Sequence, residues 1–299
     1  MRVKLMGDTH GHWDSINTTI ATLRPDVLIQ LGDFGYFPNI DRYNPCLHLA
    51  PGQSKIHFLD GNHEDHEELA KFRGENPTAH EVCPGVFYQE RGSFMDLPDG
   101  RRILFMGGAD SIDKGVRTPG FDWFPQEIIT ERDLQRLPHG QVDIVCSHTA
   151  PKRFGIKQKF LKRHGGHDFG NDPSEDALDY IFERYRPKWW FFSHWHARMY
   201  GENDGCQWFC LDVAGGHRYS FLWLDDPYPA ERKSEAELDR LFMQTCSLES
   251  IPVNVRAQFV EYMHDKTTVR IDGEERYYAW DVNAFLIGER DNNLSPTKS

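Results

Sequence analysis

The stretch KLMGDTHGHW, Lys4–Trp13, joins an apolar run to a carboxylate and an imidazole. The run stops at Gly7, and Asp8 and His10 follow one residue apart. A short apolar run that ends at a turn residue predicts a buried strand. Carboxylates and imidazoles are both common ligands of divalent metal ions. The stretch therefore predicts a strand whose carboxyl end carries metal-binding groups.

Four further runs in the chain end in the same way. Each is apolar, β-branched or aromatic, as buried strands are, and each stops at a residue that can bind a metal ion. The runs are DVLIQLGD ending at Asp33, KIHFLDGNHE with Asn62 and His63, QVDIVCSH ending at His148, and KWWFFSHWH with His194 and His196. One such ending carries little weight, but five of them predict a single metal site.

Segments with a helical pattern lie between these strands. Residues 12–25 repeat apolar side chains on one face and stop at Pro25. Residues 172–187 begin with Asp172 as the expected N-cap and Pro173 at the first helical position. Alternating strands and helices predict an α/β fold with parallel pairing. Because sites in such folds form outside the carboxyl ends of the strands, we expect the five strand ends to converge.

In chain order the candidate site residues read D-x-H, G-D, G-N-H-E, S-H and H-x-H. This ordered series resembles the calcineurin-like metallophosphoesterase superfamily, in its bacterial and phage forms. The resemblance runs from Arg2 to about Leu224. It implies an α/β fold in which two mixed β-sheets and their flanking helices form a four-layer sandwich. It also implies a metal-dependent hydrolase of phosphoric esters.

The resemblance assigns a role to each residue of the series. It implies that Asp8, His10 and His196 bind a first ion, that Asn62, His148 and His194 bind a second, and that Asp33 bridges both. It places His63 beside the ions as the catalytic residue. Carboxylate, amide and imidazole ligands without a thiolate suit borderline divalent ions. We therefore expect two divalent metal ions, manganese first, with iron, zinc or nickel as alternatives.

Two metal ions predict a mechanism. Ions about 3.5–4 Å apart can hold the attacking and leaving oxygens of an in-line displacement. A metal ion also lowers the pKa of bound water from about 15.7 toward about 7. We expect a metal-bridging hydroxide to attack phosphorus. We expect His63 to stabilise the transition-state charge or to protonate the leaving oxygen.

The sequence departs from the phosphoprotein phosphatases of this superfamily, which have a G-D-x-V-D-R-G motif and an arginine before G-N-H-E. The corresponding text here is GDFGYFP, in which Tyr36 and a phenylalanine replace the aspartate and arginine, and Asp60 precedes GNHE. Because a bidentate arginine clamp is strong and specific, its loss favours phosphodiesters slightly. The usual aspartate partner of His63 is also missing. Glu64 and Asp65 are candidate substitutes or else solvated acids at a helix start.

Two segments offer contacts to a substrate. Residues 107–127 mix glycines, charges and aromatics without periodicity, which is typical of a shaped loop. This loop presents Lys114, Arg117 and Trp123 as candidate substrate contacts, or it is a surface loop with a local salt bridge. The basic run PKRFGIKQKFLKRHGGH, residues 151–167, contains no acid and includes Arg153 as a further candidate contact. That run either steers anionic substrates or is a solvated charge run.

Composition restricts the class of protein. The chain has 299 residues, of which 39% are hydrophobic and 27% charged, as in soluble globular proteins. We expect no membrane association, because no apolar run approaches the roughly 20 residues of a membrane span and no signal peptide is apparent. Six cysteines without paired metal-type spacing favour a cytoplasmic location. A net charge of -12 disfavours nonspecific binding to duplex nucleic acid.

The chain changes character after its last expected core strand. That strand is expected in YSFLWLDD, residues 219–226, paired as a hairpin with CQWFCLDVAGGHR, residues 206–218. We expect a catalytic domain over residues 1–228 and a C-terminal α+β extension over residues 229–299. The extension combines an amphipathic helical pattern, a hairpin around Asp272-Gly273 and a disordered tail. It offers a surface for a partner or for a homo-oligomer.

Three functions are consistent with these patterns. The first is a dinuclear metal-dependent phosphoesterase that acts on a small phosphate ester, with nucleotides among the expected substrates. The second is a phosphomonoesterase, including a divergent protein phosphatase. The third is a non-catalytic scaffold that keeps the metals and binds a partner through the C-terminal extension. The retention of His63 beside a full set of ligand types argues against the third.

Overall fold

The computed structural model describes residues 1–75, 80–164, 170–214, 221–225, 268–271 and 274–277. The chain divides into two compact units, one of residues 1–17 and 25–224 and one of residues 18–24 and 225–299. Both large sheets and every candidate site residue belong to the first unit.

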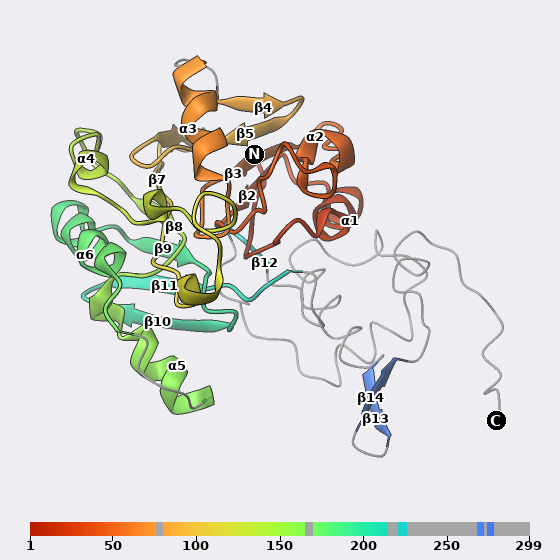
Figure 1. The fold of residues 1–299 in the computed structure, drawn as a ribbon. Helices are drawn as coiled ribbons and strands as arrows, with labels where there is room; N and C mark the ends of the chain where they lie inside the picture. Colours follow the sequence, from red (N-terminus) through yellow and green to blue (C-terminus); the bar gives the residue numbers. More distant parts are fainter. Residues whose placement is uncertain (76–79, 165–169, 215–220, 226–267, 272–273, 278–299) are drawn as a thin grey trace, which may run out of the picture. The chain divides into compact units, whose positions relative to one another are not determined.

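The first sheet is built from β1 (Val3–Met6), β2 (Val27–Gln30), β3 (Lys55–Phe58), β4 (Glu81–Cys83), β5 (Val86–Tyr88) and β12 (Phe221–Trp223). Its strand order is β12-β1-β2-β3-β5-β4 (Figure 1). The four central strands run parallel, whereas β12 and β4 pair antiparallel at the two edges. The carboxyl ends of β1, β2 and β3 therefore lie side by side.

The second sheet repeats this plan. It is built from β6 (Phe94–Asp96), β7 (Arg102–Met106), β8 (Ile144–Ser147), β9 (Trp189–Phe192), β10 (Met199–Asn203) and β11 (Cys206–Cys210). Its order is β10-β11-β9-β8-β7-β6, with a parallel centre and an antiparallel strand at each edge. The carboxyl ends of β8 and β9 are neighbours in this sheet.

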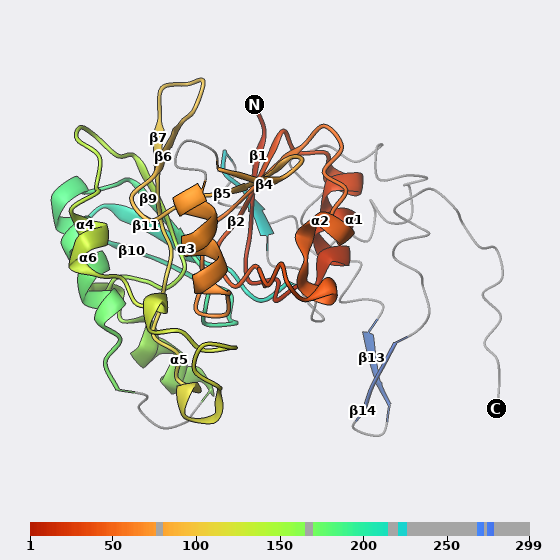
Figure 2. The ribbon, with the colours of Figure 1, turned by 45° about the horizontal axis from the view of Figure 1, so that its top comes forward.

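Helices flank the two sheets (Figure 1, Figure 2). They are α1 (Trp13–Leu23), α2 (Pro45–His48), α3 (His66–Glu75), α4 (Glu131–Leu134), α5 (Ile156–His164) and α6 (Pro173–Tyr185). Four 3-10 turns lie at Asp41–Tyr43, Lys114–Val116, Pro125–Glu127 and Lys152–Phe154. The side chain of Asp172 accepts a hydrogen bond from Ser174 N at 2.7 Å and so caps α6 as expected.

Two apolar cores hold the sheets in place. Successive residues of β7 belong to different cores, because side chains alternate between the two faces of a strand. Phe105 packs in the core shared by both sheets, and Leu104 packs in the core on the opposite face of the second sheet. The shared core joins β1 and β2 to β7, β8 and β9. The second core packs the other face of the second sheet against Leu178, Ile181 and Phe182 of α6. Both faces of this sheet are therefore buried, as its continuous apolar strands predict.

The expected fold class is confirmed, because the structure has two mixed sheets flanked by helices. One expected pairing is wrong. β11 does not form a hairpin with β12 but lies between β9 and β10 in the second sheet, whereas β12 pairs with β1 in the first. The short aromatic runs look alike in the sequence, and the choice of sheet depends on partners far away along the chain.

Of the second unit, the structure describes few elements. β13 (Thr268–Ile271) and β14 (Glu274–Tyr277) pair antiparallel on either side of residues 272–273. The expected domain boundary at residues 228–229, the expected helical segment that follows it and the expected disordered tail lie outside the described residues.

Candidate metal centre

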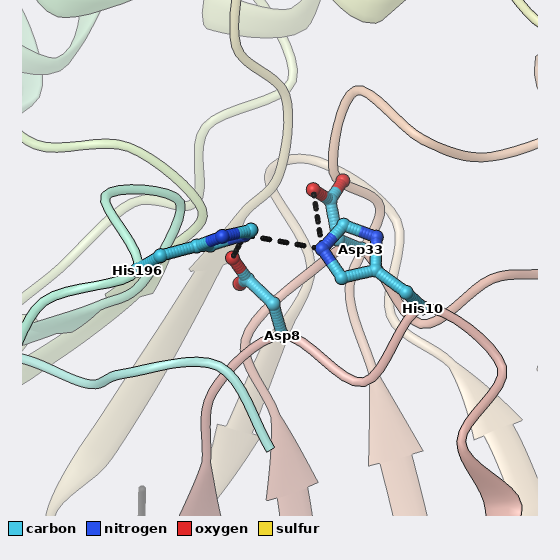
Figure 3. Close-up of side chains that lie close together, drawn as sticks. All are labelled: Asp8, His10, Asp33 and His196. Atoms are coloured by element: carbon cyan, nitrogen blue, oxygen red, sulfur yellow. Dashed lines mark hydrogen bonds and ion pairs between the residues drawn. The ribbon is translucent and has the colours of Figure 1, made fainter. Parts of the chain in front are cut away.

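The loops that follow β1, β2, β3, β8 and β9 bring the seven candidate metal ligands together. One ligand atom from each of Asp8, His10, Asp33 and His196 lies within 4.8 Å of the others (Figure 3). A second group with the same spacing consists of Asp33, His148 and His194. Asp33 belongs to both groups, as a residue between two sites must.

The first group is a chain of three close contacts. The Nε2 atoms of His10 and His196 lie 3.1 Å apart. His196 Nε2 lies 3.0 Å from Asp8 Oδ2, and His10 Nε2 lies 3.8 Å from Asp33 Oδ2 (Figure 3). Asp8 and Asp33 are buried, whereas His196 is half exposed. The group therefore opens toward solvent on the His196 side.

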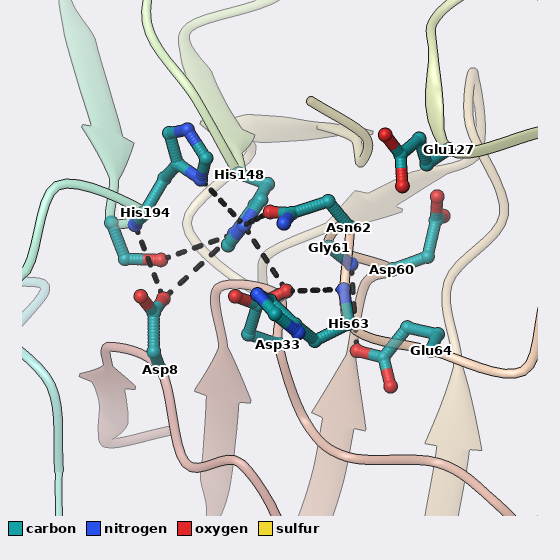
Figure 4. A network of polar contacts seen from close by, with 12 residues as sticks. Asp8, Asp33, Asp60, Gly61, Asn62, His63, Glu64, Glu127, His148 and His194 are labelled. Carbon is teal, nitrogen blue, oxygen red and sulfur yellow. Dashed lines mark hydrogen bonds and ion pairs between the residues drawn. The ribbon is translucent and has the colours of Figure 1, made fainter. Parts of the chain in front are cut away.

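The second group directs several acceptor atoms at one point (Figure 4). His148 Nδ1 lies 2.9 Å from the carbonyl oxygen of Leu31, which can only accept, so Nδ1 carries the proton. In the neutral ring Nε2 is then an acceptor, yet it faces Asn62 Oδ1 at 3.0 Å and Asp33 Oδ1 at 3.3 Å. His194 Nδ1 is 3.2 Å from the same Nε2. Acceptors that converge in this way are stabilised by positive charge among them, either a proton on Nε2 or a metal ion.

The electrostatics of His148 show how strongly this point attracts positive charge. Burial disfavours the charged form of His148, but the carboxylates of Asp33 and Asp8 outweigh burial and raise the pKa of the ring to about 10. Asp33 is buried too, and the neighbouring imidazoles of His148 and His63 nevertheless hold its pKa well below the usual range. The donor set of carboxylate, amide and imidazole therefore fits a divalent cation.

The backbone is strained at the candidate ligands. Seven non-glycine residues of the described chain have a positive φ, and four of them are candidate ligands. These are His10, Asp33, His194 and His196, with φ of 45°, 50°, 68° and 43°. Such conformations cost about 1–3 kcal/mol each and gather at functional sites. The strain turns the side chains toward one another just beyond the strand ends.

Two glycines of the sequence motifs make room for the ligands. A Cβ at Gly32 would lie 2.3 Å from His148 Nδ1, and one at Gly61 would lie 2.1 Å from Asp33 Oδ1. Both distances are shorter than atoms tolerate, and φ at Gly32 is also positive. The G-D and G-N-H-E motifs therefore need glycine so that side chains from other loops can approach.

Glu64 has a role that differs from both sequence-based alternatives. It is neither solvated nor bound to His63. Its buried carboxylate accepts hydrogen bonds from the backbone N–H groups of Phe34, Gly35 and Tyr36 at 2.7, 3.0 and 2.6 Å. Burial and the charge of Asp33 raise the pKa of Glu64 to about 8. Glu64 thus fixes the loop that follows Asp33.

The partner of His63 is an arginine. Nη2 of Arg117 lies 3.0 Å from Nδ1 of His63, and the same nitrogen donates to the carbonyl oxygen of Asn62 at 3.3 Å. The backbone N–H of His63 donates to Asp33 Oδ1 at 2.8 Å. Asp65, the other sequence candidate, instead accepts from the N–H of Glu68 at the start of α3. The loop of residues 107–127 therefore reaches His63 through Arg117.

A buried carboxylate fixes the same loop against Asn62. Glu127 accepts hydrogen bonds from Ser111 N at 2.7 Å and from Ser111 Oγ at 2.9 Å. Asn62 Nδ2 in turn donates to Ser111 Oγ at 3.0 Å, which leaves Asn62 Oδ1 facing His148. Trp123 Nε1 donates to Glu127 at 3.1 Å. No periodic pattern in the sequence predicts this network, because its members meet only when the loop folds over the strand end.

The remaining candidate substrate contacts lie apart from the metal ligands. Lys114 forms an ion pair with Asp110 at 2.8 Å. Arg153 pairs with Asp179 and Glu183 of α6 and does not line the cavity beside the candidate ligands. Arg117 is the one predicted substrate contact that touches His63.

A cavity of about 360 Å³ opens beside the candidate ligands. Its lining includes five candidate site residues, Asp33, Asn62, His63, His194 and His196, together with Trp195 and residues of α5, α6 and the loop of residues 107–127. Its size is within the usual range of small-molecule sites. The cavity therefore connects the candidate metal centre to the two segments in which the sequence predicts substrate contacts, the loop of residues 107–127 and the basic run that contains Lys157.

Residues 1–198 match the family model of the calcineurin-like phosphoesterases. The chain belongs to this family. A lariat debranching enzyme of Schizosaccharomyces pombe is 25% identical over 238 residues, which are 67% of this chain and 49% of that enzyme. The chain thus spans about half the length of this curated relative. This family membership confirms the family that the motifs resemble.

Solved structures give weaker likenesses. A Thermus thermophilus protein aligns at 12% identity with a TM-score of 0.44, covering 76% of this chain and 96% of that one. A phosphopantetheinyl hydrolase of Mycobacterium tuberculosis aligns at 14% identity with a TM-score of 0.40, covering 71% and 90%. Likeness at this level does not bear on function.

None of the described helices has the length and apolar character needed to cross a bilayer.

Proposed function

We propose that this calcineurin-like phosphoesterase hydrolyses phosphodiesters of the nucleotide type at a dinuclear metal centre. Asp8, His10, Asp33 and His196 would hold one ion, and Asp33, Asn62, His148 and His194 the other. The observation that carries the proposal is the pair of ligand groups that share Asp33, with His63 beside them. Bound there, two divalent ions would supply Lewis-acid charge and lower the pKa of an attacking water.

The chain's own residues supply the remaining chemistry. Arg117 can only donate, so Nδ1 of His63 accepts its hydrogen bond and the neutral ring carries the proton on Nε2. His63 would donate from Nε2 to a phosphoryl or leaving oxygen as negative charge develops there. Ser111 would hold the amide of Asn62 with its oxygen toward the metal.

The lack of an arginine clamp supports the preference for diesters. Among the described residues, no arginine lines the cavity, and its one lysine is Lys157. Asp60, which stands where an arginine precedes GNHE in protein phosphatases, is buried against Arg91 at 2.6 Å. A dianionic monoester would therefore meet no bidentate partner in the cavity, whereas the single charge of a diester needs less compensation.

The test is hydrolysis of bis(p-nitrophenyl) phosphate and p-nitrophenyl phosphate, with manganese and with chelator. We expect turnover of the diester only with metal, and a loss of about 10²–10⁴-fold in the His63→Ala variant. His139→Ala, a substitution of an exposed histidine, is the matched control. Preference for the monoester would contradict the diester assignment. Metal binding without turnover of either ester would contradict catalysis of this kind.

A further inference from the structure

Several residues of the cavity lining are not candidate metal ligands, and we call the part of the cavity that Lys157, Phe160, Asp172, Glu175 and Trp195 line its outer half. Phe160 of α5 and Trp195 line it, with ring centroids 5.6 Å apart and planes inclined at 54°. Trp195 also packs edge-on against His194, 5.7 Å away. An aromatic surface therefore begins directly beside the candidate metal ligands and extends away from them.

Polar groups of both kinds border this aromatic surface. The side chain of Glu175 is 8% exposed and lines the cavity, and Oδ2 of Asp172 in the same lining is buried without a hydrogen-bond partner. Burial, and then the charge of Asp172, raise the pKa of Glu175 to about 7 against the attraction of Lys157 and Lys152. Asp172 lies next to it as the α6 cap. Lys157 supplies a donor from the same wall, where it also contacts the carbonyl of Gly170.

This combination selects among possible occupants. A second phosphate would need donors and would be repelled by Asp172 and Glu175. An alkylammonium would need only acceptors and would be repelled by Lys157. A purine or pyrimidine offers N–H donors, ring or carbonyl acceptors and a flat π-face together. Buried polar groups that lack partners are satisfied when such a ligand supplies the complementary atoms.

We propose that the outer half of the cavity binds the nucleobase of a nucleotide ester, with Phe160 and Trp195 against its face and Glu175 accepting from a base N–H. The inference rests on the proposed phosphodiesterase function, because a phosphate at the metal centre places the base on this surface. The site would make the enzyme favour esters in which one arm is a nucleoside.

The test compares three esters that release the same leaving group in the presence of manganese. They are the p-nitrophenyl esters of thymidine 5′-phosphate, methyl phosphate and phosphocholine. We expect kcat/KM to be highest for the thymidine ester. The ratio of kcat/KM for the thymidine ester to that for the methyl ester should fall about tenfold in Glu175→Gln and in Phe160→Ala, as expected for loss of one base contact.

Asp176→Asn is the matched control, because Asp176 is the adjacent acid on α6, is exposed and pairs with Lys152. We expect this variant to keep the wild-type ratio. Turnover of the methyl ester with no advantage for the thymidine ester, or with an unchanged ratio in both site variants, would overturn the base site alone. A preference for the phosphocholine ester would also overturn it. Failure of all three esters would overturn the proposed function and the base site together.

Discussion

Arg117 decides which protonation states are open to His63. An aspartate partner would accept from Nδ1 and favour the imidazolium. Arg117 donates to Nδ1 instead. Burial, and then repulsion by Arg117, lower the pKa of His63 against the attraction of Asp33. His63 is therefore neutral at neutral pH, and in the proposed mechanism it would stabilise developing charge as a neutral donor instead of delivering a proton from a cation.

Replacing Arg117 should test this assignment. We expect Arg117→Met to lower kcat about 10–10²-fold with a smaller change in KM, because His63 loses its orientation and its fixed tautomer. Without the arginine the pKa of His63 rises, so activity should decline at a higher pH on the acid side than in the wild type. A pH profile of kcat from steady-state assays measures this shift. Arg117→Lys should recover part of the loss, and Arg132→Met on α4 is the control. If kcat declines at the same acidic pH in Arg117→Met as in the wild type, the assigned role of Arg117 is contradicted.

The loop of residues 107–127 contacts the candidate metal ligand Asn62 from outside the strand ends. Ser111 is its contact with Asn62, and Glu127 holds Ser111 in place. We expect Ser111→Ala to weaken binding at the second metal site about 10–100-fold, because partners that orient a ligand contribute on this scale. Calorimetric titration with manganese would measure the affinity and the number of sites. Ser93→Ala, at a half-buried serine outside the site, is the control, and equal affinities in both variants would contradict the role.

The same elements show what the sequence could and could not predict. The strands that end at Asp8, Asp33 and His148 were predictable, because burial and the turn after each strand are local properties of the chain. The sheet to which β11 belongs could not be predicted, because its pairing with β9 depends on contacts between residues far apart in the sequence. Loop contacts were also missed, as Ser111 shows. The roles of the seven residues as metal ligands stay predictions.

At the scale of the whole first unit, a buried ion pair connects the first sheet to the segment before α4. Arg91 donates to Asp60 and to the carbonyl oxygens of Gln126, Glu127 and Ile128. Burial opposes the charge on Asp60, but Arg91 outweighs it and lowers the pKa of the carboxyl. The Arg91–Asp60 ion pair therefore connects the end of β3, where the GNHE motif follows, to the end of the loop of residues 107–127.

We expect Asp60→Asn to lower the free energy of unfolding by about 3 kcal/mol at pH 7, because the buried charge of Arg91 then keeps only its longer ion pair with Asp133 at 3.5 Å. The lowered pKa means that the wild type has this stabilisation above the unfolded-state pKa and loses it as the pH falls through the folded-state value. The difference between wild type and variant should thus shrink in acid. Urea unfolding at pH 7 and at lower pH measures it. The exposed Asp99→Asn variant should behave as wild type, and a constant difference at all pH values would contradict the argument.

Metal binding should be visible in the stability of the whole molecule without any assay of activity. The candidate ligands come from loops of both sheets, so a cation that they share binds the folded chain and not the unfolded one. At a concentration of 100 times Kd, one ion would add about 2.7 kcal/mol to the free energy of unfolding. For a unit of this size that raises Tm by about 5–10 °C. Calorimetry with manganese and with chelator measures the shift. We expect Asp33→Asn to lose most of it, because Asp33 belongs to both ligand groups, while His139→Ala keeps it. A Tm that is the same with manganese and with chelator would contradict the proposed metal centre, whichever substrate the protein acts on.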